Sequence, residues 1–338
     1  HIIITYQYVV PKAVSGGEKG ATPNKLPYIN VSGEGKSVTE IVENINSLES
    51  RAPEYSHLKV ILISSEVARS INIYKLLNAL LRHNKAARNV NIFIAEGSAA
   101  SVFETDPGNE DLPAFKLNMV AENYKKATKM PPIITLGDVS KKMAGRNSFA
   151  LQRIIDRNDI MDVSGTAVIK GQENKLVGWL DEYETEGFNL MTGKVQSGSI
   201  ETIDDITGQT VVIMVEKILN RIKPVVSGDN ISFTLEIKME ANIAEDWLLT
   251  ADAFNPEFIK RMEKASEKEV MKKVSEALEK IQKVLKVDIA GFGKKLSIKY
   301  PSVWRKVENN WDEQFSRVPV YPEVKINIRA YGRQGSKY

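Results

Sequence analysis

Apolar residues recur along the chain at two spacings, which predict strands in some segments and helices in others. Alternation is clearest over residues 231–241, where every second residue is apolar and Ser, Thr, Glu or Lys stands between. The same alternation returns at Val324, Ile326, Ile328 and Ala330. Strict alternation is typical of a strand with one buried face. We therefore expect an antiparallel sheet in the last third of the chain.

A long helix is predicted between these two strands. Asn255 suits its cap, Pro256 its first turn and Gly291 its end. We expect one helix over 256–288 that packs its apolar stripe on the sheet, while Lys and Glu cover the other face. The residues of the stripe are Ile259, Met262, Val270, Val274, Ala277, Ile281 and Val284.

The first third of the chain mixes both spacings. A strand-like run at 2–10 comes first, and Ser37-Val38-Thr39-Glu40 is a capping box that predicts a helix to about residue 48. Short apolar runs at 58–63 and 90–95 predict buried strands, and the helical spacing between 73 and 81 predicts a helix. This order predicts a layered domain of sheet and helices.

Turn residues divide the rest of the chain. Residues 163–169 and 175–180 predict two strands joined by a turn at 171–174. The predicted class is therefore α+β and multidomain, with two to three mixed α/β domains, the last one a sheet packed by the long helix. The expected divisions are an N-terminal domain over 1–160, a small central domain with the hairpin over 161–200, and a C-terminal domain over 201–338.

Composition excludes several classes of function. The chain has no cysteine, which rules out thiolate metal sites and cysteine nucleophiles. Its net charge of +3 does not predict nucleic-acid binding, and no apolar run is long enough to predict a membrane-spanning helix. The three histidines, His1, His57 and His83, lack the spacing of metal ligands. We expect no metal and no cofactor.

Two short motifs could carry chemistry. Gly33-Glu34-Gly35-Lys36-Ser37 resembles the end of a phosphate-binding loop, but Asn30 stands where the full motif has its first glycine. We favour a glycine turn leading into the helix. The acidic run at 181–186 could serve acid–base catalysis or bind Ca²⁺. It matches no calcium loop, so we expect a solvated loop or helix start, and we nominate no catalytic residue.

Basic pairs are expected on solvated faces. They include Lys272-Lys273 and Lys294-Lys295, and most have acidic neighbours in the sequence. A weak attraction to an anionic membrane surface is a secondary expectation.

Aromatic residues gather near the C-terminus. Pro301 can begin a helix that places Trp304, Val307, Trp311 and Phe315 on one face. Large aromatic side chains of this kind belong to a core or to a partner surface. The candidate residues for packing or interaction are Gly291, Phe292, Gly293, Tyr300, Pro301, Trp304, Trp311 and, upstream, Trp179.

These motifs together resemble the signature of the Ger(x)C family. Gly-Phe-Gly at 291–293, Tyr-Pro-x-x-Trp at 300–304 and Trp-Asp-Glu-x-Phe at 311–315 are similar to its C-terminal signature. Its central segment is similar to residues 165–180, followed by Glu-Thr-Glu-Gly at 184–187. Residues 57–63 and 77–82 resemble its N-terminal half, so the resemblance runs nearly end to end.

The resemblance implies the C subunit of a spore nutrient-germinant receptor. Such a subunit is a non-catalytic lipoprotein on the outer face of the inner spore membrane, extracytoplasmic, and works with an integral-membrane A subunit and a transporter-like B subunit. The resemblance also implies three mixed α/β domains. The signal peptide and the lipid-bearing (palmitoylated) cysteine of the family would precede His1. Because the chain opens in a strand-like run without Met, we expect a trimmed N-terminus.

Two alternatives stay open. One is an extracytoplasmic small-molecule-binding module that senses the nutrient directly. The other is a soluble nucleotide-dependent enzyme that uses Gly35-Lys36-Ser37. A lipid-modified cysteine upstream of His1 would exclude the enzyme, and ligand titration would distinguish a scaffold from a sensor.

Overall fold

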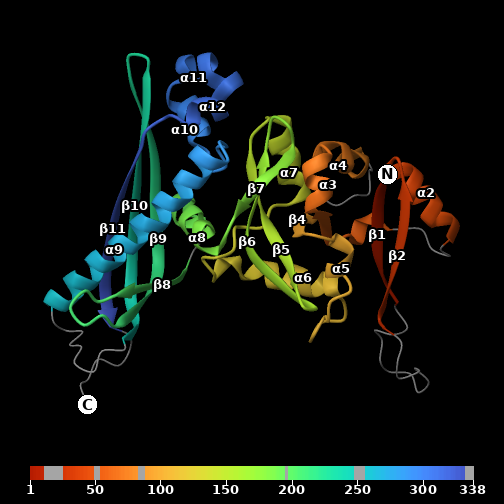
Figure 1. Ribbon diagram of the computed structural model, residues 1–338, viewed down its shortest axis with the longest axis horizontal. Coiled ribbons are helices and arrows are strands. Elements are labelled where there is room, and N and C mark those ends of the chain that lie inside the picture. The colour runs from red at the N-terminus through yellow and green to blue at the C-terminus, as the bar shows by residue number, and fades with distance from the viewer. Residues whose placement is uncertain (11–25, 49–53, 83–87, 195–196, 247–255, 332–338) are drawn as a thin grey trace. The chain divides into compact units, whose positions relative to one another are not determined.

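The computed structural model describes residues 1–10, 26–48, 54–82, 88–194, 197–246 and 256–331. The chain forms two compact units. The first comprises His1–Glu122 and Ile133–Val177, and the second comprises Asn123–Pro132 and Gly178–Tyr338. Both units combine helices with strands (Figure 1), so the expected multidomain α+β class is confirmed. The expected division into domains over 1–160, 161–200 and 201–338 stays a prediction.

A five-stranded sheet organises the first unit, in the order β3-β4-β5-β6-β7. Its first three strands run parallel and β6 returns antiparallel to β5. The strands expected at 58–63 and 90–95 are confirmed as β3 and β4. The bounds are β3 (Val60–Ser64), β4 (Asn91–Glu96), β5 (Phe149–Arg157), β6 (Ile160–Lys170) and β7 (Lys175–Leu180).

Strand β5 is not predicted by the sequence pattern, because polar residues interrupt its apolar run. Gln152 is 1% exposed and donates a hydrogen bond from Nε2 to the Ala121 carbonyl at 3.1 Å. A buried amide with a partner of this kind can replace an apolar residue in a core strand. The alternation that identifies other strands is therefore absent here.

The helices of the first unit lie beside this sheet. Several of them connect its strands along the chain. The helices expected at 37–48 and 73–81 are confirmed as α2 and α4. The bounds are α2 (Val38–Leu48), α3 (Ser65–Ser70), α4 (Ile73–Arg82), α5 (Ala99–Val102), α6 (Pro113–Ala121) and α7 (Leu136–Ala144), with a 3₁₀ turn η1 (Tyr55–His57). A further 3₁₀ turn, η2 (Glu122–Lys125), begins at the last residue before the second unit and belongs mostly to that unit.

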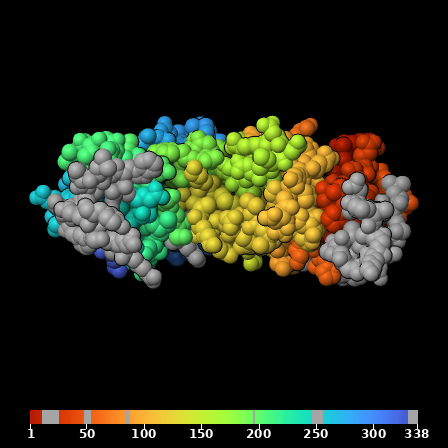
Figure 2. Space-filling view, turned by 90° about the horizontal axis from the view of Figure 1, so that it is seen from below, coloured from red at the N-terminus to blue at the C-terminus, as the bar shows by residue number. Residues whose placement is uncertain are grey.

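The opening strand does not join the main sheet. β1 (Ile2–Val9) pairs antiparallel with β2 (Tyr28–Gly35) in a two-stranded ribbon. The Gln7 side chain links this ribbon to the rest of the unit, because it donates to the Phe103 carbonyl at 3.2 Å and accepts from the Ala114 N–H at 3.0 Å. The red atoms of the ribbon accordingly adjoin orange atoms of the same unit in Figure 2.

The glycines of the phosphate-loop-like motif serve helix packing. Gly33 and Gly35 lie in β2, not in the turn that we expected, and a Cβ on either would come 2.9 Å from an isoleucine of α2. The Glu40 carboxylate accepts the Lys36 N–H at 2.8 Å. A carboxylate thus already lies at the helix start where a phosphate would bind.

The second unit is built on a four-stranded sheet in the order β11-β10-β9-β8. β8 (Gly198–Ile203), β9 (Thr210–Ser227) and β10 (Asn230–Asp246) are antiparallel, but β11 (Val320–Tyr331) runs parallel to β10. The sheet is therefore mixed, which corrects the expectation of a wholly antiparallel one. The reason is the long crossover between β10 and β11, which returns the chain to the end where β10 began.

That crossover contains the predicted helix, which runs along one face of the sheet (Figure 1). α9 spans Pro256–Glu279 and continues as a π-helical turn, η3 (Lys280–Val284), so it ends before residue 288. Lys286 ends it in the left-handed conformation, with φ of 53°. Asn255, the expected cap, lies outside the described residues.

The apolar stripe of this helix is buried along most of its length, but Ile259 at its start is only half-buried and Val284 at its end is exposed. Met262, Val274 and Ile281 are fully buried, whereas Val284 is 63% exposed. The π-helical turn explains the difference, because a wider turn moves the following residues around the helix axis. Val284 therefore leaves the stripe that sequence spacing assigned to it.

A matched pair of substitutions tests this placement. Ile281→Asp should lower the free energy of unfolding by at least about 3 kcal/mol, because an unpaired charge would be buried. Val284→Asp, three residues away, should change it by less than about 1 kcal/mol. Urea unfolding of the two variants measures both values. Equal destabilisation by the two substitutions would contradict the conclusion that the π-helical turn places Val284 outside the buried stripe.

Candidate interaction site

Four short elements follow α9 and carry the aromatic signature near the tip of the β9–β10 hairpin (Figure 1). They are α10 (Phe292–Lys299), α11 (Pro301–Val307), η4 (Glu308–Asn310) and α12 (Trp311–Phe315). The single helix expected from Pro301 is therefore broken. Asn310 leaves the helical region, with φ of −126° and ψ of 27°, and asparagine is a weak helix former.

The rings of these elements pack on each other and on the sheet. Phe233 of β10 meets Phe292 edge-on at 5.1 Å between ring centroids, and Phe292 meets Phe315 at 5.2 Å. Trp311 lies 5.4 Å from Trp304. Edge and offset contacts at such distances are the favoured geometries of aromatic pairs. Because Phe233, Phe292 and Phe315 are fully buried, this part of the signature forms a core.

The Asp288 carboxylate holds the cluster together. Oδ1 accepts the backbone N–H groups of Gly291 at 2.7 Å and Phe292 at 3.1 Å. Oδ2 accepts the N–H of Gly293 at 2.7 Å and the Trp311 indole N–H at 2.8 Å. These donors include the free N–H groups at the start of α10, where a negative charge is also favoured by the helix dipole. One buried side chain thus fixes both α10 and α12.

Both glycines of the signature are required by this geometry. Gly291 has φ of 87°, a conformation that other residues rarely adopt. A Cβ on Gly293 would lie 2.5 Å from Trp311 Nε1 and 2.8 Å from the Trp304 ring. The two tryptophans therefore leave space for glycine only.

The remaining candidate residues have different positions. Tyr300 and the exposed Pro301 join α10 to α11, and Lys299 beside them donates to the Pro224 carbonyl at 3.1 Å. Trp304 is half-buried at the edge of the cluster. Trp179 is half-buried on β7 and is not one of these rings.

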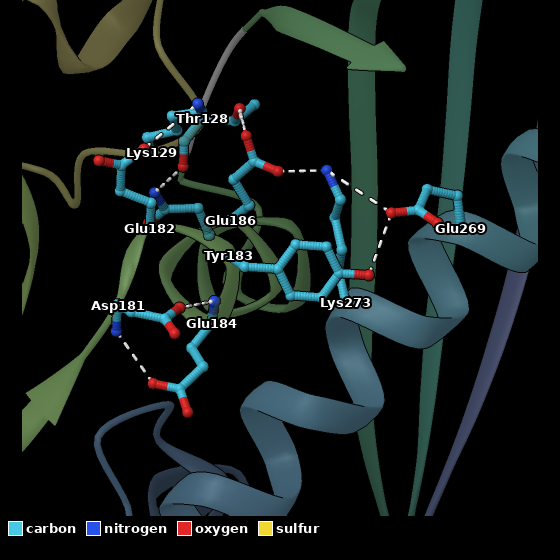
Figure 3. A network of polar contacts seen from close by, with 10 residues as sticks. Thr128, Lys129, Asp181, Glu182, Tyr183, Glu184, Glu186, Glu269 and Lys273 are labelled. Carbon is cyan, nitrogen blue, oxygen red and sulfur yellow. Dashed lines mark hydrogen bonds and ion pairs between the residues drawn. The ribbon is translucent and has the colours of Figure 1, made fainter. Parts of the chain in front are cut away.

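A second group of signature residues forms a buried polar network between two helices (Figure 3). Helix α8 (Glu182–Thr192) begins with a complete capping box made by Asp181 and Glu184. Its Glu186 forms an ion pair with Lys273 of α9, and both side chains are buried. Thr128 Oγ1 donates to the other Glu186 oxygen at 2.9 Å. The acidic run is a helix start as expected, but it is not wholly solvated, and neither is the pair Lys272-Lys273.

The helices can approach because Gly187 lies at their contact. A Cβ on Gly187 would come 2.0 Å from the Lys273 carbonyl oxygen. Around this contact Tyr183 donates its hydroxyl to Glu269 at 3.0 Å, and Glu269 lies 4.0 Å from the Lys273 ammonium. Burial, together with the hydrogen bond to Glu269, raises the pKa of Tyr183 above its usual range. The Glu-Thr-Glu-Gly motif therefore marks a helix–helix contact.

The described residues offer no cluster of three or more His, Asp or Glu side chains suited to a metal ion. His57 ends the 3₁₀ turn η1, and His83 lies outside the described residues. Within the same ranges, no helix combines the length and apolar character needed to cross a bilayer.

Comparison with known proteins identifies the family. Residues 164–332 match the family model described as "Spore germination B3/ GerAC like, C-terminal", and residues 1–155 match "Spore germination protein N-terminal domain". The chain belongs to the GerAC-like spore germination family. The resemblance found in the signature motifs is thereby confirmed.

Relatives in the GerAC-like family match nearly the whole chain. Spore germination protein YndF of Bacillus subtilis (strain 168) is 34% identical over 98% of this chain and 83% of its own length. Spore germination protein B3 of the same organism is 27% identical over 98% of this chain and 87% of its own length. The crystal structure of the GerBC protein matches with a TM-score of 0.70 and 25% identity, over 96% of this chain and 93% of that chain.

Removal of the Asp288 carboxylate should disrupt the aromatic cluster. Asp288→Ala leaves four donors without an acceptor and should lower the free energy of unfolding by at least about 3 kcal/mol. Asp288→Asn, whose amide oxygen still accepts, should cost less. Glu308→Ala, on the exposed turn η4, is the control and should change stability by less than about 0.5 kcal/mol. Chemical denaturation followed by tryptophan fluorescence measures all three.

The buried ion pair should behave as a coupled unit. Lys273→Met leaves the Glu186 charge without its partner and should cost about 3–5 kcal/mol of stability. Adding Glu186→Gln should recover most of that loss, since the double variant buries no charge. A double-mutant cycle by urea unfolding gives the coupling. Additive losses would show that the pair contributes no specific interaction.

Proposed function

We propose that this chain is the C subunit of a spore nutrient-germinant receptor. It acts as a non-catalytic lipoprotein tethered to the outer face of the inner spore membrane, beside the A and B subunits of the same receptor. The observation that carries the proposal is the family match over both halves of the chain, 1–155 and 164–332. Relatives named for spore germination at up to 34% identity agree with it.

The internal roles of the signature residues support a scaffold. Asp288, Gly293 and Trp311 hold the aromatic cluster, and Glu186 and Gly187 join α8 to α9. These residues maintain a shape instead of presenting free groups to a substrate. A subunit of fixed shape can position its partners in a membrane complex.

A membrane tether would keep such a scaffold close to its partner subunits. One acyl chain binds membranes only marginally, so stable placement needs a second chain or added protein contacts. Confinement beside the A and B subunits raises the effective concentration of each partner. Contacts too weak to form in solution can then hold the complex together.

Untethering should therefore slow germination. Spores that lack the native subunit are complemented either with the lipidated protein or with a secreted form whose lipid-bearing cysteine is changed to alanine. At matched protein levels we expect the secreted form to respond to nutrient far more slowly, as measured by loss of optical density. A response as fast as that of the lipidated form would contradict the tethered scaffold and favour a diffusible sensor.

A further inference from the structure

Positive charge is concentrated in one short segment of the second unit. Residues 292–310, which form α10, α11 and η4, contain five basic side chains and one acidic side chain, a net charge of +4. The whole chain has 46 basic and 43 acidic residues, a net charge of +3. The rest of the protein therefore has a net charge of −1. The basic residues are Lys294, Lys295, Lys299, Arg305 and Lys306.

Four of these cations face solvent. Lys294, Lys295, Arg305 and Lys306 are exposed, and none of them takes part in the ion pairs found among the described residues. Glu308, the one acidic residue of the segment, is also exposed, but the other nearby carboxylates are already engaged. Asp288 and Asp312 accept hydrogen bonds within the cluster, and Glu313 pairs with Arg317.

The long helix provides an internal contrast. α9 has six basic and six acidic residues among its 24, so its exposed lysines alternate with carboxylates. That pattern is typical of a solvated face. The segment 292–310 lacks this balance.

An aliphatic side chain lies among the cations. Ile298 is 68% exposed on α10, and it lies four residues after Lys294, on the same side of the helix. The opposite side carries the buried Phe292 and Leu296. Exposed cations around an apolar residue, with the half-buried rings of Tyr300 and Trp304 at the border, are typical of helices that lie in a membrane interface.

We propose that the exposed side chains of this segment, Lys294, Lys295, Ile298, Arg305 and Lys306, which we call the basic face, bind the surface of an anionic phospholipid bilayer. The cations contact headgroup phosphates, while Ile298 inserts below them. An acidic protein would satisfy the cations, but the exposed Ile298 favours lipid, which accepts an apolar side chain without a matching pocket. The aromatic cluster under α10 holds the face in one arrangement.

Vesicle sedimentation of the purified chain tests the proposal. Vesicles contain phosphatidylcholine alone or with about one-third phosphatidylglycerol. Each basic residue near an anionic surface strengthens binding by about fivefold. We expect binding to the anionic vesicles only, lost at high salt, and at least about tenfold weaker when all four cations are changed to Gln.

The matched control changes four exposed lysines of α9, Lys260, Lys264, Lys268 and Lys272, to Gln. It alters the net charge equally and should retain binding. Ile298→Ser should bind vesicles several-fold more weakly but bind soluble polyglutamate as the unchanged protein does. Circular dichroism confirms that each variant is folded.

Two results would overturn the proposal. One is equal loss of binding in the α9 control and in the basic-face variant, which would show a net-charge effect. The other is binding to polyglutamate without binding to anionic vesicles, which would identify an acidic protein as the partner. Neither result bears on the receptor role, since vesicle binding is measured without A and B subunits and without germination.

Discussion

The carboxylate of Asp288 is the contact on which the end of the second unit depends. It receives four hydrogen bonds, three from the start of α10 and one from the indole of Trp311 in α12. Its own backbone N–H donates to Asp312 at 3.1 Å, so α12 is bound from two directions. Hydrogen bonds to a buried charge are stronger than neutral ones. This one side chain therefore gives a fixed arrangement to helices too short to be stable alone.

The sheet depends on α9 in a similar way. Strand β11 is an edge strand, and such an edge presents unpaired backbone N–H groups that could pair with another chain. Glu263 and Glu267 of α9 accept the N–H groups of Ile328 and Ile326, each at 3.0 Å. The helix thus covers one face of the sheet and also occupies part of its edge. The Glu186–Lys273 pair then fixes α9 against α8, at a position where only glycine fits.

Sequence patterns identified the elements that have one buried face. Strand β10 and helices α4 and α9 are of this kind, because their apolar residues recur at the strand or helix spacing. The missed features have other causes. β5 contains the buried Gln152, whose partner lies 31 residues away. The parallel pairing of β11 and the burial of Lys273 depend on contacts that are distant in sequence. At the aromatic cluster, the sequence pattern indicated that large rings lie in contact. The central role of Asp288 could not be predicted, since an aspartate beside a turn usually caps a helix or faces solvent.

The signature residues are determined by packing inside the unit, whereas the exposed residues of α10 are not. Gly291, Gly293, Trp311 and Glu186 are determined by what lies against them inside the unit. Residues of this kind identify a fold, because replacing them disturbs packing wherever the fold occurs. Lys294, Lys295 and Ile298 contact solvent, so the fold does not require their identity. They lie on α10, however, which Asp288 and the aromatic cluster hold in a fixed position. Their charges are therefore presented in a fixed arrangement. Because the helix is already fixed, binding to a partner surface requires little further ordering of the backbone and therefore costs little entropy. Weak contacts are then enough to orient the protein.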